Sequence, residues 1–178
     1  MHTLWQRASA LSTFAVTVLA IMASLASVTD LFHPSKATVD LDVKGVDALY
    51  AEKGVDKALL NIEMHADLRS EFSWNTKQLY VYVLAEFETE ESPYNEMVIW
   101  NRIIQSKANA KLDIRKLQKM YPFVLSDQGK GLRDTEFNVT VAWNVMPHVG
   151  RLYTRKKTFT GLAFPSYYIE PKKNTKSS

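Results

Sequence analysis

One uncharged, apolar run near the N-terminus constrains this chain more than any other feature. Residues 8–28 contain no charged side chain, and as an α-helix they would rise about 32 Å, which matches a hydrocarbon core of roughly 30 Å. Arg7 precedes the run, whereas Asp30 is the first charged residue after it. The positive-inside rule therefore predicts a membrane-spanning helix with a cytosolic leader at residues 1–7 and with the rest of the chain on the lumenal or outer side.

A cleaved signal peptide is the alternative interpretation of this run. Ser24, Leu25 and Ala26 place small residues at the spacing that a signal peptidase reads, and Ser27 follows them. The apolar segment of a signal peptide typically has only about 7–15 residues, so the length of this run favours a retained anchor. If the run is removed, the remainder is a secreted β-sandwich binding module. N-terminal sequencing of the mature protein distinguishes the two cases.

The part of the chain after the anchor is long enough for one domain with a sizeable core. We expect this domain at residues 31–170, followed by a disordered basic tail at residues 171–178. The chain has no cysteine, so the domain depends on its hydrophobic core rather than on disulfides, and thiolate metal sites are excluded. The net charge of +3 comes from lysines and arginines spread along the chain, and this distribution argues against nucleic-acid binding.

Alternation of apolar and polar residues predicts that the domain consists mainly of β-strands. The period of two is clearest in five segments, at residues 38–43, 60–68, 79–87, 97–104 and 137–145. A sixth strand is expected near residues 158–164, while residues 112–117 fit either a strand or one helical turn. Many short strands separated by turns are typical of an antiparallel β-sandwich, so we predict an all-β domain behind one transmembrane helix.

The strand predicted at residues 79–87 is largely apolar or aromatic on both faces, which indicates a central strand or one covered by a partner. Tyr80, Tyr82 and Trp100 lie opposite the more strictly aliphatic face of their strands. They are therefore the candidate residues for a partner interface, because aromatic side chains are enriched at interfaces. The aromatic residues expected in the core are Trp74 and Trp143.

Asn138, Val139 and Thr140 form the one N-x-S/T sequon of the chain. In the strand predicted at residues 137–145, Val139 belongs to the buried face, so Asn138 and Thr140 point the other way. A glycan can be accommodated on that face. The sequence thus predicts N-glycosylation of Asn138 on the lumenal side of the membrane.

No catalytic, cofactor-binding or metal-binding residue can be assigned from the sequence. The four histidines show no HxxxH or HExxH spacing, and no GxSxG turn presents a serine nucleophile. Gly129 and Gly131 lack the third glycine and the helix of a phosphate-binding loop. A hydrolase whose serine, histidine and acidic side chains converge from distant positions is a second alternative, and it requires a cleft with that geometry.

Three segments have the sequence, order and spacing of a known family. They are FSWNTKQLYVYVLAEF at residues 72–87, NEMVIWNRII at residues 95–104 and NVTVAWNVMPHVG at residues 138–150. The anchor, the chain length and the turn at residues 127–132 extend the likeness over nearly the whole chain. With these segments the chain resembles the family of the noncatalytic 22/23-kilodalton subunit of the eukaryotic signal peptidase complex, signal peptidase complex subunit 3.

The resemblance implies a protein of the endoplasmic reticulum membrane with a cytosolic N-terminus and a lumenal β-sandwich. It also implies a noncatalytic subunit without a cofactor, which braces a separate catalytic subunit that supplies the serine nucleophile, alongside the other subunits of the complex. The glycosylation sequon of the family maps onto Asn138. Anchoring both partners in one bilayer raises their effective concentration, so a modest interface suffices to keep them together.

Overall fold

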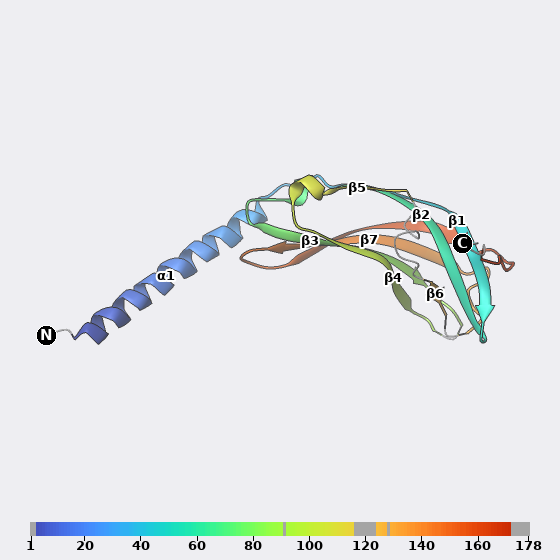
Figure 1. Cartoon of the computed structure of the whole chain (residues 1–178), viewed down its shortest axis with the longest axis horizontal. Coiled ribbons are helices and arrows are strands. Elements are labelled where there is room, and N and C mark those ends of the chain that lie inside the picture. Colours follow the sequence, from blue (N-terminus) through green and yellow to red (C-terminus); the bar gives the residue numbers. More distant parts are fainter. Residues whose placement is uncertain (1–2, 91, 116–123, 128, 172–178) are drawn as a thin grey trace, which may run out of the picture.

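The computed structural model describes residues 3–90, 92–115, 124–127 and 129–171, and shows one long helix followed by two antiparallel β-sheets (Figure 1). Helix α1 (Leu4–Leu31) begins with a capping box, in which the Thr3 hydroxyl accepts from the Gln6 amide and the Gln6 side chain accepts from the Thr3 amide. The helix extends away from the sheets, and none of its most apolar segment is buried. Its length and composition are those of a membrane-spanning helix.

Several hydroxyl side chains within α1 donate to carbonyls of the preceding turn of the helix. Thr13 Oγ1 donates to the carbonyl of Ser9 over 3.0 Å, and Thr17 Oγ1 donates to the carbonyl of Thr13 over 2.8 Å. Ser24 Oγ donates in the same way to Ala20 over 2.9 Å. Because a polar group in lipid needs an internal partner, these bonds make the hydroxyls compatible with a hydrocarbon environment.

The first sheet is centred on β2, which pairs with three other strands, all antiparallel. Its strands are β1 (Thr38–Glu52), β2 (Val55–Asp67), β5 (Lys111–Ile114) and β6 (Leu125–Ser126). Two short 3-10 helices, η1 (Arg69–Glu71) and η2 (Lys107–Asn109), lie in the connections at one end of the sheet. In Figure 1 this sheet forms the upper layer of the domain.

The second sheet has the strand order β4-β3-β7-β8 and forms the lower layer in Figure 1. Its strands are β3 (Thr76–Phe87), β4 (Asn95–Ile104), β7 (Glu136–Pro147) and β8 (Tyr153–Ala163). Strands β3 and β7 occupy its centre, which confirms the central position predicted for residues 79–87. The antiparallel, sandwich-like arrangement confirms the predicted fold class.

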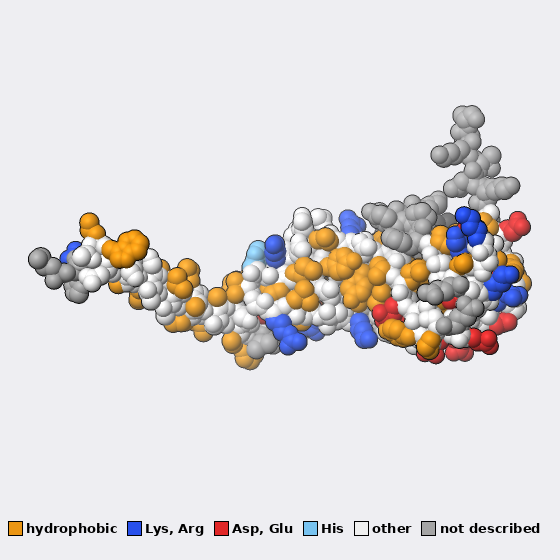
Figure 2. All heavy atoms as spheres, turned by 90° about the horizontal axis from the view of Figure 1, so that it is seen from below, with side chains coloured by type: hydrophobic (Ala, Val, Ile, Leu, Met, Phe, Trp, Pro, Cys, Tyr) orange, Lys and Arg blue, Asp and Glu red, His pale blue; other side chains and the backbone are white. Residues whose placement is uncertain are grey.

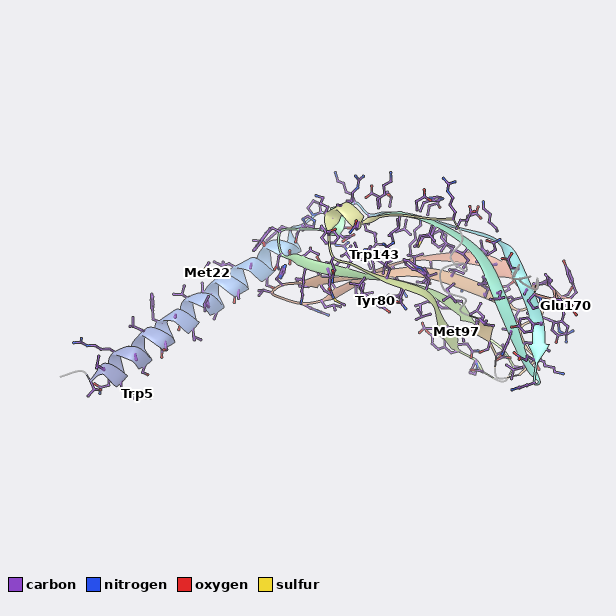
Figure 3. The ribbon with its side chains drawn as sticks, viewed as in Figure 1. Trp5, Met22, Tyr80, Met97, Trp143 and Glu170 are labelled. Carbon is purple, nitrogen blue, oxygen red and sulfur yellow. The ribbon has the colours of Figure 1, made fainter. Side chains whose placement is uncertain are left out.

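One hydrophobic core lies between the two layers. The alternation in the sequence correctly identified its main contributors: Ile62 and Met64 of β2 are at most 1% exposed, and Val81 and Val83 of β3 are fully buried. Trp143 of β7 is 6% exposed and lies between the layers, as predicted and as Figure 3 shows. Inward-facing residues of both sheets therefore meet as the period of two requires.

Strands β1 and β8 are longer than the sequence predicted. Two register shifts interrupt β1, between Val43 and Gly45 and between Val46 and Ala48, so its period is lost halfway along. Strand β8 already begins at Tyr153. Its charged first half lies exposed at the edge of the sheet and shows no alternation, so the sequence pattern does not predict it. The segment at residues 112–117 is a strand as far as Ile114, and residues 116–117 lie outside the described residues. So do residues 172–178 of the tail predicted at residues 171–178.

The C-terminal segment returns to β1 and closes the domain. Leu49 and Ile169 exchange two backbone hydrogen bonds of 2.8 and 2.7 Å. Nearby, the Tyr168 hydroxyl donates to Oδ1 of the fully buried Asp56 over 3.0 Å. These contacts hold the segment around Ile169 against the first sheet.

Candidate functional site

A polar junction joins the end of α1 to the second sheet. Asp30 Oδ1 accepts from the Ser73 hydroxyl over 2.9 Å, and Asp30 Oδ2 accepts from Asn75 Nδ2 over 2.5 Å. Asn75 Nδ2 also donates to the carbonyl of Val149 over 2.7 Å, while Asn75 Oδ1 accepts from the Val149 amide over 3.2 Å. We call Asp30, Ser73, Asn75 and Val149 the junction network. It ties the helix to the turn between β7 and β8 through one amide.

An amide is the side chain that this position requires. Asn75 is 2% exposed, and it uses both donors of its nitrogen and its oxygen within the junction network. An aspartate there would lack the two donors and would place a second carboxylate against Asp30. Since buried polar groups need partners, the network is stable only when Asp30, Asn75 and the turn at Val149 come together.

The turn before β3 positions the side chains of the network. Thr76 Oγ1 accepts from the Ser73 amide over 3.0 Å and donates to the carbonyl of Glu71 over 3.0 Å. The Asn75 amide donates to Ser73 Oγ over 3.1 Å. Short hydroxyl side chains that bond to nearby backbone are typical of such turns. They hold Ser73 and Asn75 toward the helix.

A second set of contacts secures the segment that follows α1. A ring nitrogen of His33 hydrogen bonds with the carbonyl of Ser70 over 2.7 Å, and the Ser35 hydroxyl donates to the carboxylate of Glu71. Glu71 is 1% exposed, and Arg155 Nε of β8 lies 3.4 Å from its Oε2. A buried carboxylate therefore has both a hydroxyl and a guanidinium partner, as its desolvation requires.

The same end of the domain changes the acidity of a tyrosine. Burial, together with the carboxylates of Asp30 and Glu71, raises the pKa of Tyr153 above its ordinary value. The phenol therefore stays neutral at physiological pH. Tyr153 lines a cavity of about 300 Å³ between the helix end and β8, with Arg155 over its ring at 5.7 Å.

The turn between β7 and β8 packs directly on the helix through a glycine. Gly150 has a φ of +113°, and a Cβ atom there would lie 2.6 Å from Ser27 Oγ and 3.1 Å from Ser27 Cβ. Figure 1 shows this turn beside the last turns of α1. Only glycine combines the backbone conformation with so close an approach.

We expect Gly150→Ala to destabilise the protein more than Gly161→Ala. Gly161 also has a positive φ, +80°, but no atom lies within 4 Å of its Cβ position. Both variants suffer backbone strain of about 1–2 kcal/mol, and Gly150→Ala adds a steric conflict with α1 of about 1–3 kcal/mol. Thermal unfolding of the full-length chain in detergent measures the difference. Equal losses would show that the turn does not contact the helix.

The outer face of the second sheet carries exposed apolar and aromatic side chains. We call Tyr80, Tyr82, Leu84, Val98 and Ile103 the outer aromatic face. The pairing of β3 with β4 sets Tyr80 opposite Ile103 and Leu84 opposite Val98, and the two tyrosine rings stack with centroids 5.3 Å apart. Ile103 is 54% exposed and the others are half-buried. Figure 2 shows an apolar band across this side, and Figure 3 places Tyr80 on the opposite side of the sheet from Trp143.

Trp100 is a core residue, so the prediction that it shares an exposed face with Tyr80 is wrong. It is 1% exposed and lies opposite Val83 of the inner face. The pairing of Leu84 with Val98 leaves Ile99 as an extra residue, which forms a β-bulge. The bulge shifts the alternation by one residue and turns Trp100 inward.

Trp74 is exposed, so the prediction that it packs in the core is also wrong. Its side chain is 70% exposed at the junction between the helix and the sheets. Its neighbours Ser73 and Asn75 both turn toward Asp30, which leaves the indole outside the network. The exposure of Trp74 thus follows from the contacts of its neighbours with the end of α1, which the local sequence does not predict.

Asn138 lies on the outer side of β7, at the end remote from the helix. It pairs with Glu86, is half-buried, and lines an open depression of about 380 Å³ together with Tyr94. The depression offers space for a glycan on the side of the second sheet that also carries the outer aromatic face. Glycosylation of Asn138 stays a prediction.

Two of the described histidines, His33 and His65, take part in structural contacts. His33 binds a backbone carbonyl, and His65 Nδ1 lies 3.1 Å from the carboxylate of Asp113 on the surface of the first sheet. Within residues 3–90, 92–115, 124–127 and 129–171, no histidine ring hydrogen bonds to a serine hydroxyl, and no three acidic or histidine side chains are placed to hold a metal ion.

The sequence does not predict the junction network. In the sequence, Asp30 stands out only as the charge that ends the apolar run, and Ser73 and Asn75 only as neighbours of a tryptophan. The partners of Asn75 are 45 and 74 residues away in the chain. A pair of short polar residues just before a central strand was the one local signal.

Comparisons with known proteins agree on one family. A family model described as signal peptidase subunit matches residues 1–167. Signal peptidase complex subunit 3 of Dictyostelium discoideum is 29% identical over 170 residues, which cover 96% of this chain and 98% of that protein. The subunits 3 of Gallus gallus and Homo sapiens are 31% and 30% identical over 159 residues, each covering 85% of this chain and 87% of the relative. The chain therefore belongs to the family of signal peptidase complex subunit 3.

Proposed function

We propose that this protein is a noncatalytic subunit that braces the catalytic subunit of the signal peptidase complex from the lumenal side of the membrane. Its family membership makes it a subunit of that complex at the endoplasmic reticulum membrane, associated with other subunits. The observation that carries the bracing role is the junction network, because it fixes the orientation of the β domain relative to the membrane helix.

A brace must hold its partner at one height and angle above the bilayer. The junction network supplies that property, since the buried residue Asn75 is hydrogen bonded both to α1 and to the β7–β8 turn. Glu71 adds a second attachment through Ser35 and Arg155. A domain held in this way loses little orientational freedom when it binds, and preorganisation of this kind strengthens an interface.

The outer aromatic face is the surface that we assign to the catalytic subunit. Its centre, Tyr80 and Tyr82, combines large apolar rings with polar hydroxyls, as interface tyrosines commonly do. Ile103 adds exposed aliphatic area beside them. Anchoring both partners in one bilayer raises their effective concentration, so even a modest interface on the outer aromatic face can keep them associated.

Site-specific photocrosslinking in intact microsomes tests this assignment. A photoreactive amino acid at Tyr82 or Ile103 is expected to form a covalent adduct with the signal peptidase catalytic subunit. The matched control is Asp42, which lies exposed on the outer side of the first sheet. Adducts to the catalytic subunit from Asp42 but not from Tyr82 or Ile103 would contradict the proposed interface.

Glycosylation of Asn138 tests the lumenal orientation. We expect endoglycosidase treatment to increase the electrophoretic mobility of the protein from microsomes, because oligosaccharide transfer occurs only in the lumen. The Asn138→Gln variant should migrate like the treated protein and should not respond to the enzyme. Protease added to sealed microsomes should leave the β domain intact, and its digestion would refute the orientation even if Asn138 carries no glycan.

A glycan also limits where the partner binds. Asn138 pairs with Glu86, which follows Tyr82 by four positions, or roughly 13 Å along β3. The catalytic subunit is therefore expected to cover the half of the outer aromatic face nearer the membrane, where Tyr80 and Ile103 lie.

A further inference from the structure

We propose that the end of the β domain beside α1 inserts into the lipid headgroup layer. The inserting surface, which we call the membrane-facing rim, consists of Phe32, Trp74, Val149 and Leu152. These side chains are 81%, 70%, 40% and 46% exposed. The rim would contact the boundary between phospholipid headgroups and acyl chains. This inference requires only that α1 spans the membrane and is independent of the bracing role.

The contacts of the helix set the depth of the rim. A bilayer of roughly 40–45 Å with a hydrocarbon core of about 30 Å leaves a headgroup layer of about 6 Å on each side. At 1.5 Å per residue, the first residues after Val28 cross that layer. Gly150 packs against Ser27 at the end of the apolar run, and Asn75 binds Asp30 just beyond it, so the two segments lie at the edge of the hydrocarbon core and in the headgroup layer.

The membrane-facing rim is attached to those two segments. Trp74 lies between Ser73 and Asn75, both of which hydrogen bond to Asp30. Val149 and Leu152 flank the turn in which Gly150 touches the helix. The junction network therefore holds the rim beside the end of the helix.

The chemistry of the rim suits this depth. Tryptophan prefers the membrane interface, where its ring is apolar and its N–H remains hydrated. Trp5 occupies the opposite end of α1 (Figure 3) and is 83% exposed. Together with Trp74, it places a tryptophan at each end of the span. Arg151 lies in the turn between Val149 and Leu152 and can extend its guanidinium to lipid phosphates. Figure 2 shows basic side chains where the helix meets the domain.

Tryptophan fluorescence of the full-length protein in phosphatidylcholine vesicles tests the proposal. Trp100 and Trp143 are 1% and 6% exposed, so the difference between Trp5→Phe and Trp5→Phe/Trp74→Phe reports Trp74. We expect that difference spectrum to be blue-shifted and to be lost in vesicles whose lipids carry bromine close to the headgroup. A red-shifted spectrum that responds to aqueous iodide and not to brominated lipid would overturn the proposal.

A labelling experiment keeps the proposal testable if the Trp74 variant fails to fold. The chain has no cysteine, so Leu152→Cys and Tyr94→Cys each carry one polarity-sensitive fluorophore. Tyr94 is 66% exposed and follows β3, whose length of about 40 Å separates it from the junction. Lipids with a headgroup nitroxide should quench the label at position 152 and not at position 94.

Equal quenching at the two positions would contradict membrane insertion of the rim. A label at position 152 that enters an apolar environment only after the catalytic subunit is added would also overturn the proposal, because the rim would then bind protein. Both readouts use the subunit alone as the reference. Failure of the bracing role would leave them unchanged.

Discussion

Replacing Trp100 with alanine is expected to lower the free energy of unfolding of the β domain by about 3–5 kcal/mol. Trp100 is 1% exposed and is the largest side chain among those that are almost completely buried. Its removal leaves a cavity between the sheets that neighbours such as Val83 cannot fill. Urea unfolding of the full-length chain in detergent, followed by circular dichroism, measures the loss.

Ile103→Ala is the matched control on the same strand. Ile103 is 54% exposed on the outer side of β4, so its truncation should change stability by no more than about 0.5 kcal/mol. If the outer aromatic face binds the catalytic subunit, Ile103→Ala should instead reduce recovery of that subunit in pull-downs from mild detergent. Equal losses of stability for the two variants would contradict the inward position of Trp100.

Replacing Asn75 with alanine is expected to disconnect the β domain from α1. The change removes hydrogen bonds to Asp30 and to both backbone groups of Val149. Loss of these three hydrogen bonds, one of them to a carboxylate, should cost about 2–4 kcal/mol in total. Limited proteolysis is expected to cleave the segment at residues 32–37 faster than in the unchanged protein, while the sheets stay folded.

Asn61→Ala removes the same kind of interaction at a different place. Asn61 Nδ2 donates to Asp47 Oδ1 over 3.1 Å on the surface of the first sheet. Because water replaces this bond, the substitution should change stability by no more than about 0.5 kcal/mol and leave proteolysis near the helix unaltered. Similar behaviour of both variants would show that the junction network is not a structural constraint.

The alternation of side chains predicted the faces of the inner strands well. In β2, β3 and β7, a polar or aromatic side chain on one face follows an apolar one on the other, and the structure buries the predicted residues. One face of such a strand packs in the core and the other faces outward, so the two faces require different side chains. The alternation in the sequence therefore predicts which residues are buried.

Bulges account for the errors in β1 and β4. An extra residue at Ile99 moved Trp100 from the expected outer face to the core, and two register shifts hid the second half of β1. A bulge depends on the pairing of two strands. An alternation pattern taken from one strand alone therefore assigns the residues after the bulge to the wrong face of the sheet.

The candidate site was less predictable than the fold. The outer aromatic face could be anticipated from Tyr80 and Tyr82, because the strand that carries them is apolar on both sides. The junction network could not, because Asp30, Asn75 and Val149 acquire their roles only through contacts across the chain. Trp74 was misplaced for the same reason.

The long sequence separation within the junction network affects biosynthesis. On the proposed topology α1 enters the bilayer early in translation, whereas Asn75 lacks its last partner until Val149 has left the ribosome and the β7–β8 turn has formed. In a nascent or truncated chain that ends before this turn, the orientation of the growing sheet relative to α1 is not yet fixed. The domain therefore reaches its final orientation only when synthesis is nearly complete, and incomplete chains lack the fixed orientation with which the finished subunit would enter an assembly.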